Sequence, residues 1–431
     1  MIRFFIRSYL FLSSFVLIFI IIKFNSFSQL LVRKDYLIIC LILILFIFFF
    51  YFATKFTRQI QEYIVIIVSS IILTLYICEG YLYFNNSKKS KILDNKMLNN
   101  NYDQSSLYQI YQDKKKINNK IVLSMSPIHL INNHKENFFP ISGISNSETI
   151  HCNENGYYSL YQSDRYGFNN PDKEWDSKSV EYLLVGDSFT HGACVNRPYD
   201  ITSKLREFSK KSALNLGYSG NGPLIEYATL REYFVSDVKK VIWLFWEGND
   251  NKDLINELKI KILNNYIKDP YFTQNLKFKQ NEIDSILLEV LKNESFKKEE
   301  EENNNFFYVK ILKFIKLDYV RKKIFFHQAP VPNELKKIFK LANEFIKINN
   351  SKLYFVYLPS FERYRYQTIN FGRKHEIKEI IDSLNIDFID IDNEVFRKEK
   401  NPLKLFPFEK PGHYTEEGYN KVALKIYENT K

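Results

Sequence analysis

The stretch EYLLVGDSFTHG, residues 181–192, joins an apolar run to a cluster of small and polar residues. The run from Leu183 to Val185 is typical of a buried strand, which Gly186 and Ser188 end abruptly. Two interpretations are open on this stretch alone. Ser188 is the cap of a short helix, or it is a nucleophile placed where a parallel strand leaves its sheet. The rest of the chain has to decide between them.

Further short apolar runs follow this one and alternate with amphipathic stretches. The alternation predicts βαβ units, and therefore an α/β fold with a parallel sheet covered by helices. The stretch that begins at Pro332 places its apolar residues on one helical stripe, and residues 415–430 should form the last helix. We expect strands at residues 181–186, 212–217, 240–246, 352–358 and 387–391.

Three long apolar runs precede this part of the chain, at residues 4–22, 36–52 and about 63–78. Each approaches the twenty or so apolar residues that a membrane-spanning helix needs. The first run has no small-residue cleavage site after it, which argues against a cleaved signal peptide. We therefore predict three transmembrane helices within residues 1–84 and a multi-pass protein of the cell inner membrane.

The regions around the predicted sheet differ in composition. Residues 85–120 are rich in Asn, Ser and Lys and are predicted to form a polar linker. Residues 121–179 carry scattered aromatic and turn residues and are expected to form an irregular lead-in. The α/β domain should span residues 180–431, with a helical insertion at about 255–330 whose acidic run, 297–305, is solvated.

Charge and cysteine content exclude some classes of function. The formal net charge is +11, but the Lys and Arg residues are scattered between acidic runs, so we expect no nucleic-acid partner. The cysteines and histidines have no metal-ligand spacing, and we predict neither a metal nor a cofactor. Cys40 and Cys78 lie in apolar runs. Cys152 and Cys194 could pair in an oxidising compartment, although nothing in the sequence shows that they are close.

Polar groups follow each of the first three predicted strands, at residues 186–190, 215–223 and 246–250. A fourth group presents His413 directly before the last helix. Because the carboxyl ends of parallel strands meet at one edge of a sheet, we expect these groups to converge. Ser188 needs a base to become a nucleophile, and His is the side chain suited to that near neutral pH.

The order of these blocks resembles the SGNH (GDSL) hydrolase superfamily. The matching positions are Gly-Asp-Ser at 186–188, Asn215 with Gly220, Gly-Asn-Asp at 248–250, and His413. The resemblance covers about residues 180–431 and implies a flavodoxin-like α/β/α sandwich without a cofactor. It also implies a catalytic Ser188, a general base at His413, and an oxyanion hole formed by Ser188, Gly220 and Asn249.

One position departs from the pattern of that family. The family carries an Asp three residues before its catalytic His, and this chain has Lys410 there. Glu409, four residues before His413, is the nearest carboxylate in sequence and is predicted as the catalytic substitute. Asp390 or Asp392 would serve only if the fold brought them close. A backbone carbonyl in this role and an impaired enzyme also stay open.

Several neighbouring residues are expected to be structural. Asp187 should stabilise the turn before Ser188, and Asp250 should brace the loop of Asn249. His191 should point along the first helix rather than toward a substrate.

Three functions follow from this sequence. The leading hypothesis is a membrane-anchored serine esterase that acts on O-acyl groups of an envelope carbohydrate or lipid. The second is a glycan O-acetyltransferase that works with a separate acyl-donor membrane protein. The third is a non-catalytic glycan-binding or scaffold protein, motivated by the missing Asp. Counting Lys and Arg favours a cytoplasmic domain by a small margin, whereas work on the envelope favours an extracytoplasmic one.

Overall fold

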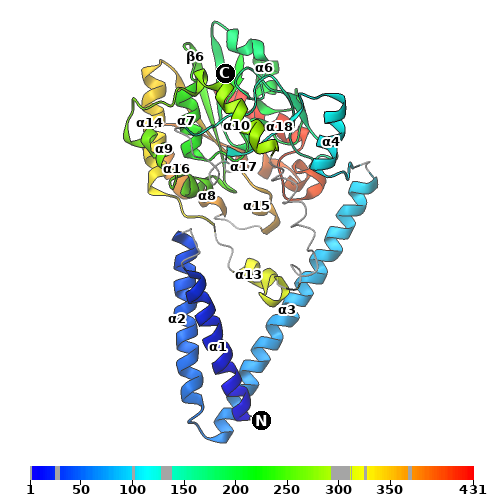
Figure 1. The fold of residues 1–431 in the computed structure, drawn as a ribbon, viewed down its shortest axis with the longest axis vertical. Coiled ribbons are helices and arrows are strands. Elements are labelled where there is room, and N and C mark those ends of the chain that lie inside the picture. The colour runs from blue at the N-terminus through cyan, green and yellow to red at the C-terminus, as the bar shows by residue number, and fades with distance from the viewer. Residues whose placement is uncertain are drawn as a thin grey trace. The chain divides into compact units, whose positions relative to one another are not determined.

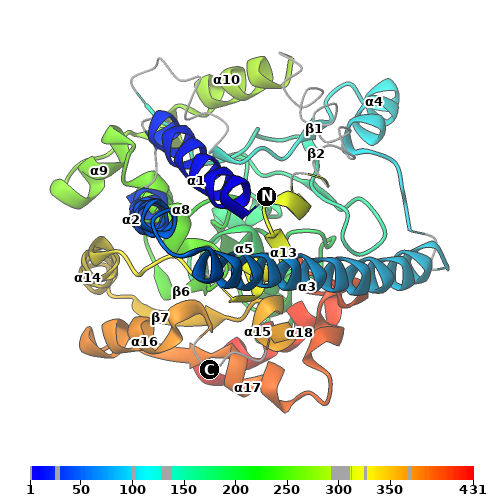
Figure 2. The ribbon, with the colours of Figure 1, turned by 90° about the horizontal axis from the view of Figure 1, so that it is seen from below.

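Five parallel strands form the central sheet of the described chain, and all five coincide with predicted strands (Figure 1). Their spatial order is β5-β4-β6-β7-β8, in which β6 and β7 lie side by side (Figure 2). Numbered along the chain this order is 2-1-3-4-5, the flavodoxin-like arrangement, so the predicted α/β fold class is confirmed. The strands are β4 (Val180–Gly186), β5 (Ala213–Asn215), β6 (Val238–Trp246), β7 (Lys352–Leu358) and β8 (Asp387–Asp390).

The structure is a computed structural model. Its described residues fall into two compact units, and the sheet belongs to the second, which comprises Ser90–Asn304 and Gln328–Lys431. The first comprises Met1–Lys89 and Asn305–His327. The residues described are 2–24, 30–99, 102–127, 138–292, 311, 313–324, 328–366 and 371–431.

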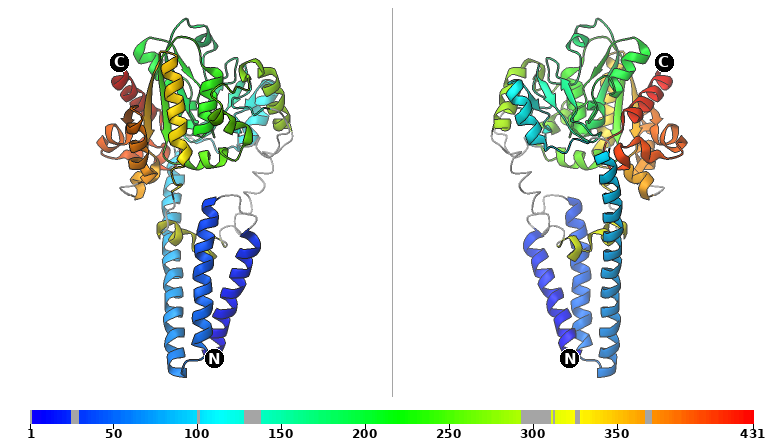
Figure 3. Two further views of the ribbon diagram at one scale, coloured as in Figure 1. Left: turned by 90° about the vertical axis from the view of Figure 1, so that its left-hand side faces the viewer. Right: turned by 90° about the vertical axis from the view of Figure 1, so that its right-hand side faces the viewer.

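Helices cover both faces of the sheet, because alternate side chains of each strand point to opposite sides. Leu183 and Val185 of β4 lie in one apolar core, whereas Tyr182 and Leu184 lie in the other. The result is a three-layer α/β/α sandwich (Figure 3). The first face is covered by α7 (Pro223–Tyr233), α14 (Asn333–Ile348) and α16 (Lys374–Ser383), and the second by α6 (Ile201–Ser209) and α18 (Glu416–Thr430).

The strand order makes the carboxyl end of β4 the switch point of the sheet. From β4 the chain passes to β5 on one side and then crosses back to β6 on the other. The helices that follow these strands therefore leave β4 on opposite faces of the sheet. Ligands of open α/β sheets bind outside such a switch point. Residues that directly follow β4 and β6 therefore lie where a ligand would bind.

The lead-in at residues 121–179 is more regular than predicted. It contains a small sheet of order β1-β2-β3, in which β2 and β3 are antiparallel. Backbone hydrogen bonds between His151 and Ser159 and between Ser159 and Cys152 extend this hairpin beyond its strands. The strands are β1 (Val122–Leu123), β2 (Glu148–Ile150) and β3 (Leu160–Gln162).

Helices also occupy much of the predicted linker at 85–120. Helix α3 (Arg58–Asn99) continues through its first part, and α4 (Leu107–Ile117) forms most of its second part. A capping box begins α4, since Ser106 accepts from the amide of Gln109, whose side chain accepts from the amide of Ser106. The polar composition suggested a linker, but this local start signal produces a helix.

The predicted insertion is helical, and its first part belongs to the core. Helices α8 (Asp250–Glu257), α9 (Lys261–Lys268) and α10 (Gln280–Lys292) contribute to it. Leu263 and Ile283 of this part are completely buried in the first apolar core. The acidic run at 297–305 lies outside the described residues.

The later part of the insertion packs on α3 within the first unit. The buried carboxylate of Glu79 accepts from the amides of Tyr319 and Val320, at 3.0 and 2.8 Å. The hydroxyl of Tyr76 donates to the carbonyl of Ile315 at 3.1 Å. These contacts join α3 to the short helix α13 (Asp318–Ile324).

One helical segment among the described residues, Arg58–Asn85, is long and apolar enough to cross a membrane. It belongs to α3, and 6% of its apolar window is buried in the protein. The other two predicted spans coincide with α1 (Ile2–Phe24) and α2 (Leu30–Ala53), which stay predictions as membrane spans.

Candidate active site

Ser188 begins α5 (Ser188–His191) directly after β4, but it is not the cap of that helix. The cap is Asp187, whose carboxylate accepts from the amide of Phe189 at 2.9 Å. The expected structural role of Asp187 is thereby confirmed. Gly186 makes the sharp turn possible, because a Cβ there would lie 2.1 Å from the hydroxyl of Thr190. The Ser188 hydroxyl lies 3.3 Å from Oδ2 of Asp187, and it has a second, closer partner.

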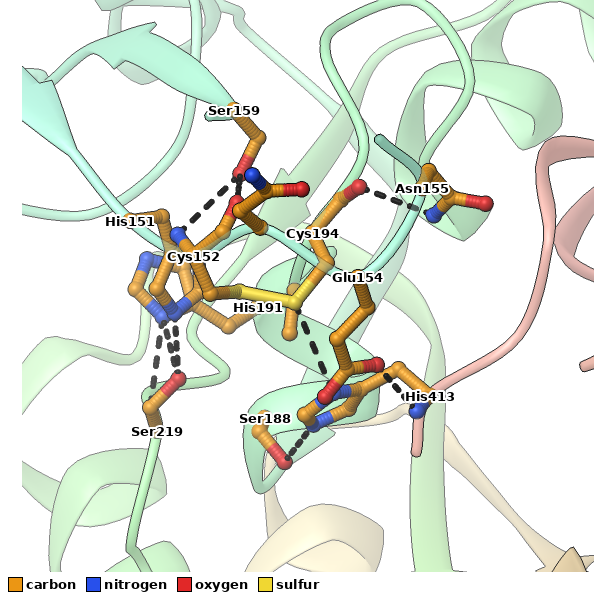
Figure 4. The surroundings of a disulfide bond; sticks show 12 residues. His151, Cys152, Glu154, Asn155, Ser159, Ser188, His191, Cys194, Ser219 and His413 are labelled. Carbon is orange, nitrogen blue, oxygen red and sulfur yellow. Dashed lines mark hydrogen bonds and ion pairs between the residues drawn. A yellow bond between two sulfur atoms is a disulfide. The ribbon is translucent and has the colours of Figure 1, made fainter. Parts of the chain in front are cut away.

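That partner is His413, which lies 225 residues further along the chain. The Nε2 atom of His413 is 2.8 Å from the Oγ of Ser188 (Figure 4). On the other side of the ring, Nδ1 is 3.0 Å from Oε1 of Glu154. A carboxylate only accepts hydrogen bonds, so this contact puts the ring proton on Nδ1 and leaves the Nε2 lone pair facing Ser188. That is the tautomer a general base requires.

Glu154 holds the backbone of His413 as well as its ring. The amide of His413 donates to Oε2 of the same carboxylate at 2.6 Å. This approach depends on Gly412, where a Cβ would lie 2.6 Å from Oε2. One carboxylate therefore fixes both the position and the orientation of the imidazole.

The Glu154 position corrects the prediction for Glu409. Glu409 ends a short 3₁₀ turn with a positive φ of 55°, and no hydrogen bond joins it to His413 among the described residues. Asp390 and Asp392 are also engaged elsewhere, with Lys374. The carboxylate that contacts His413 comes from the lead-in, 259 residues before it.

The pKa values of His413 and Glu154 reflect the attraction between these two side chains. Burial alone would lower the pKa of His413, but the hydrogen bond and charge of Glu154, with the charge of Asp187, raise it above its ordinary value. Burial alone would raise the pKa of Glu154, but the hydrogen bonds and charge of His413 lower it. The two side chains keep 21% and 29% of their surface exposed, so the site is open to solvent.

The two predicted oxyanion donors follow β5 and β6. Gly220 has a φ of +85°, and a Cβ there would lie 1.8 Å from the hydroxyl of Ser126, so only glycine fits. Asn249 precedes α8 without capping it through its side chain. Asp250 braces this loop as expected, because its carboxylate accepts from the amide of Trp246 at 2.7 Å. The roles of Gly220 and Asn249 toward an oxyanion stay predictions.

Two further histidines contact Ser219, which lies in the loop that carries Gly220. The Nε2 of His151 and the Nδ1 of His191 are 2.7 and 3.1 Å from the hydroxyl of Ser219. His191 also stacks on Tyr218 and is completely buried, which agrees with the structural role expected for it. Burial lowers the pKa of His151 to about 3 and that of His191 well below its ordinary value, so both are neutral.

A disulfide joins Cys152 to Cys194, with their Cα atoms 4.9 Å apart. The pairing left open by the sequence is therefore present. The Cys194 sulfur is 3.7 Å from Nδ1 of His413, and Glu154 lies beside it (Figure 4). These three side chains cluster like metal ligands, but the sulfur is already bound in the disulfide and offers no thiolate to a metal.

Sequence reasoning missed Glu154 because the residue belongs to no motif. The only signal was its position two residues after Cys152. If Cys152 is paired with Cys194, six residues after Ser188, then residue 154 must lie near Ser188. The sequence alone gave no reason to prefer that pairing.

Comparisons with known proteins give fold-level neighbours only. No family model matches the chain, and no curated protein matches it. One similar solved structure is a protein described as lipolytic and of the G-D-S-L family, from Desulfitobacterium hafniense DCB-2, with 14% identity and a TM-score of 0.32. Another is an acetyl xylan esterase, AlAXEase, with 12% identity and the same TM-score. Each comparison covers 58% of this chain and 99% of the other. With scores this low, the fold assignment rests on the strand order described above.

Proposed function

We propose that this protein is a membrane-anchored serine esterase of the SGNH type, acting on O-acyl groups of an envelope carbohydrate or lipid. The observation that carries the proposal is the chain of contacts from Ser188 through His413 to Glu154. A nucleophile, a base and a group that orients the base are the parts that acyl transfer through serine requires. They stand at the carboxyl end of the strand where α/β sheets carry their sites.

The reaction would proceed through an acyl-enzyme. Ser188 Oγ attacks the ester carbonyl while Nε2 of His413 takes the hydroxyl proton, and Glu154 stabilises the imidazolium that forms. The tetrahedral oxyanion accepts hydrogen bonds from the amides of Ser188 and Gly220 and from the side chain of Asn249. His413 then returns the proton to the departing alcohol. Water repeats the sequence and releases the acid.

Two observations weigh on the other hypotheses. The scaffold hypothesis was motivated by a missing carboxylate, and Glu154 supplies one. The disulfide supports an oxidising compartment, and thus an extracytoplasmic domain of an inner-membrane protein, against the count of cations. Among the described residues, no specific contact favours transfer to a glycan over transfer to water.

The test is hydrolysis of p-nitrophenyl acetate by the full chain in detergent. We expect S188A and H413A each to lower kcat by about 10³-fold or more. A fluorophosphonate probe should label the wild type and fail to label S188A. The matched control is S285A, which changes an exposed serine on α10 and should leave both results unchanged. Absence of turnover and of labelling in the wild type would reject the proposal. Acetyl transfer to a sugar acceptor in preference to water would replace esterase with transferase.

A further inference from the structure

The group that orients the base comes from a separate piece of structure. Ser188 follows the central sheet, and His413 directly precedes the last helix of the sandwich. Glu154 instead lies in the loop between β2 and β3 of the small lead-in sheet. Its carboxylate reaches His413 only if that loop is held against the sandwich. The question is what holds it there.

Both sides of Glu154 are attached to the same residue of the sandwich. Two residues before it, Cys152 forms the disulfide with Cys194. One residue after it, the side-chain amide of Asn155 donates to the backbone carbonyl of Cys194 at 3.0 Å. Glu154 is therefore fastened between two attachments to Cys194, and one of them is covalent (Figure 4).

The remaining contacts of this loop are hydrogen bonds, and one of them joins the backbone amide of Asp103 to the carbonyl of Gly156 at 2.9 Å. The hydroxyl of Tyr157 donates to Glu416 at 2.7 Å, and the amide of Leu160 donates to the side chain of Asn196 at 2.8 Å. Each such bond contributes only about 1 kcal/mol net, so none of them fixes the loop as a covalent link does. Among the described contacts of this loop, the disulfide is the covalent one.

Reduction would also change what faces Nδ1 of His413. Breaking the S–S bond adds two electrons and two protons and gives two thiols, while a dithiol reductant is oxidised to its own disulfide. The Cys194 sulfur already lies 3.7 Å from Nδ1. A thiol beside an imidazole readily gives up its proton, and a thiolate there would hold His413 in its protonated form. A protonated His413 cannot accept the proton of Ser188.

We propose that the Cys152–Cys194 disulfide is a redox-dependent positioning device, so that only the oxidised chain holds Glu154 against His413 and hydrolyses esters efficiently. This proposal rests on the proposed esterase function and deepens it. It assigns the disulfide a role in the chemistry and makes the enzyme sensitive to dithiols.

The test compares the oxidised and the dithiothreitol-reduced full chain, with thiols counted in both forms. We expect reduction to lower kcat for p-nitrophenyl acetate by about 10- to 100-fold, with KM changed less than threefold, and reoxidation with oxidised glutathione to restore it. The variant C40S/C78S removes the two other cysteines and should respond like the wild type. The variant C152S/C194S should be slow in both conditions and insensitive to the reductant.

The pH profile separates positioning from general stability. Charged groups that face His413 are Glu154 from the lead-in loop and Asp187 from the cap of α5, while His151 and His191 are neutral. In C152S the free thiol stays at residue 194, so the acid limb of kcat should lie at higher pH than in C194S.

Several outcomes overturn the proposal. One is full kcat and an unchanged acid limb in a chain whose thiols show complete reduction. Another is a loss of kcat that appears only together with a loss of the tryptophan fluorescence of the folded domain. Failure of the esterase function itself looks different, because the oxidised wild type would then show no turnover that depends on Ser188.

Discussion

At the scale of single residues, the site depends on how one carboxylate is shared between two donors. Glu154 accepts from the ring and from the backbone amide of His413, and Gly412 leaves the room for it. Lys410 occupies the position three residues before His413, and the carboxylate that contacts the ring comes from another segment.

The variant E154Q should lower kcat and shift its pH dependence. Glu154 raises the pKa of His413, and the base works only when it is unprotonated, so wild-type activity should fall as the pH drops through that raised pKa. Without the negative charge the pKa of His413 falls and the acid limb moves to lower pH. At the optimum we expect kcat to fall by about 10²- to 10⁴-fold. Kinetics from pH 5 to 9 provide the measurement.

The control for this variant is E282Q, which changes an exposed carboxylate on α10. The dependence of kcat on pH in E282Q should match that of the wild type. An acid limb of E154Q at the wild-type pH would show that Glu154 does not set the protonation of the base.

At the scale of elements, buried carboxylates hold the helices that follow the strands. Glu257, at the end of α8, accepts from the amides of Gly222 and Leu224 at 2.5 and 2.9 Å, where α7 begins. The first amides of a helix have no partner within it, so this carboxylate caps α7 from a distance. It thereby ties α8, next to Asn249, to the helix that follows the Gly220 loop.

The variant E257A should therefore destabilise the second unit. Removing the acceptor takes this partner from the buried amides of Gly222, Leu224 and Ile225, and we expect the free energy of unfolding to fall by about 2 kcal/mol. Guanidinium denaturation followed by tryptophan fluorescence measures it. The variant K252A, an exposed change on the same helix, should differ from the wild type by less than about 0.5 kcal/mol.

The variant E257A should also change how the free energy of unfolding depends on pH. Burial raises the pKa of Glu257 from its ordinary 4.5 to about 8. Between those values the folded chain keeps a proton that the unfolded chain has lost, so wild-type stability should fall as pH rises from 5 to 8. E257A removes this contribution, and its stability should vary less over the same window. An equal slope in both proteins would contradict the prediction.

The strands and helices also show which parts of the fold can be predicted from the sequence. The strands were predictable because each is a short apolar run bounded by turn residues, and α14 because Leu335, Ile338 and Phe339 share one buried stripe. The position of Glu154 was not, because it depends on a contact across 259 residues and on a disulfide that the sequence left open. The continuation of α3 to Asn99 was missed because its last part is polar.

At the scale of the whole chain, the α/β unit should fold without the first unit. A truncated protein of residues 102–431, with 305–327 replaced by a short Gly-Ser linker, should be folded and retain esterase activity. Retaining 305–327 without α3 should cause aggregation, since Ile311, Phe314 and Ile315 are exposed apolar side chains and the last two also lose their contacts with Tyr76 of α3. Size-exclusion chromatography and circular dichroism distinguish the two proteins.

The truncated protein should begin at residue 102 because residues 102 and 103 contact the loop that carries Glu154. Tyr102 donates to the carbonyl of Asn153 at 3.0 Å, and the amide of Asp103 donates to the carbonyl of Gly156 at 2.9 Å. A version that begins at residue 120 lacks both supports of the Glu154 loop and should have a lower kcat. Equal kcat in the two versions would show that these contacts do not support the site.

The origin of Glu154 in the lead-in also bears on where the proposed esterase begins along the chain. A segment that begins at residue 180 contains Ser188 and His413, the proposed nucleophile and base, but lacks Glu154. The shortest segment that contains all three residues of the proposed site therefore extends upstream to include the β2–β3 loop and its cysteine. Exchange of that loop between related chains would alter catalytic rate while Ser188 and His413 stayed the same. Active and inactive relatives should then be told apart by the loop and not by the motif.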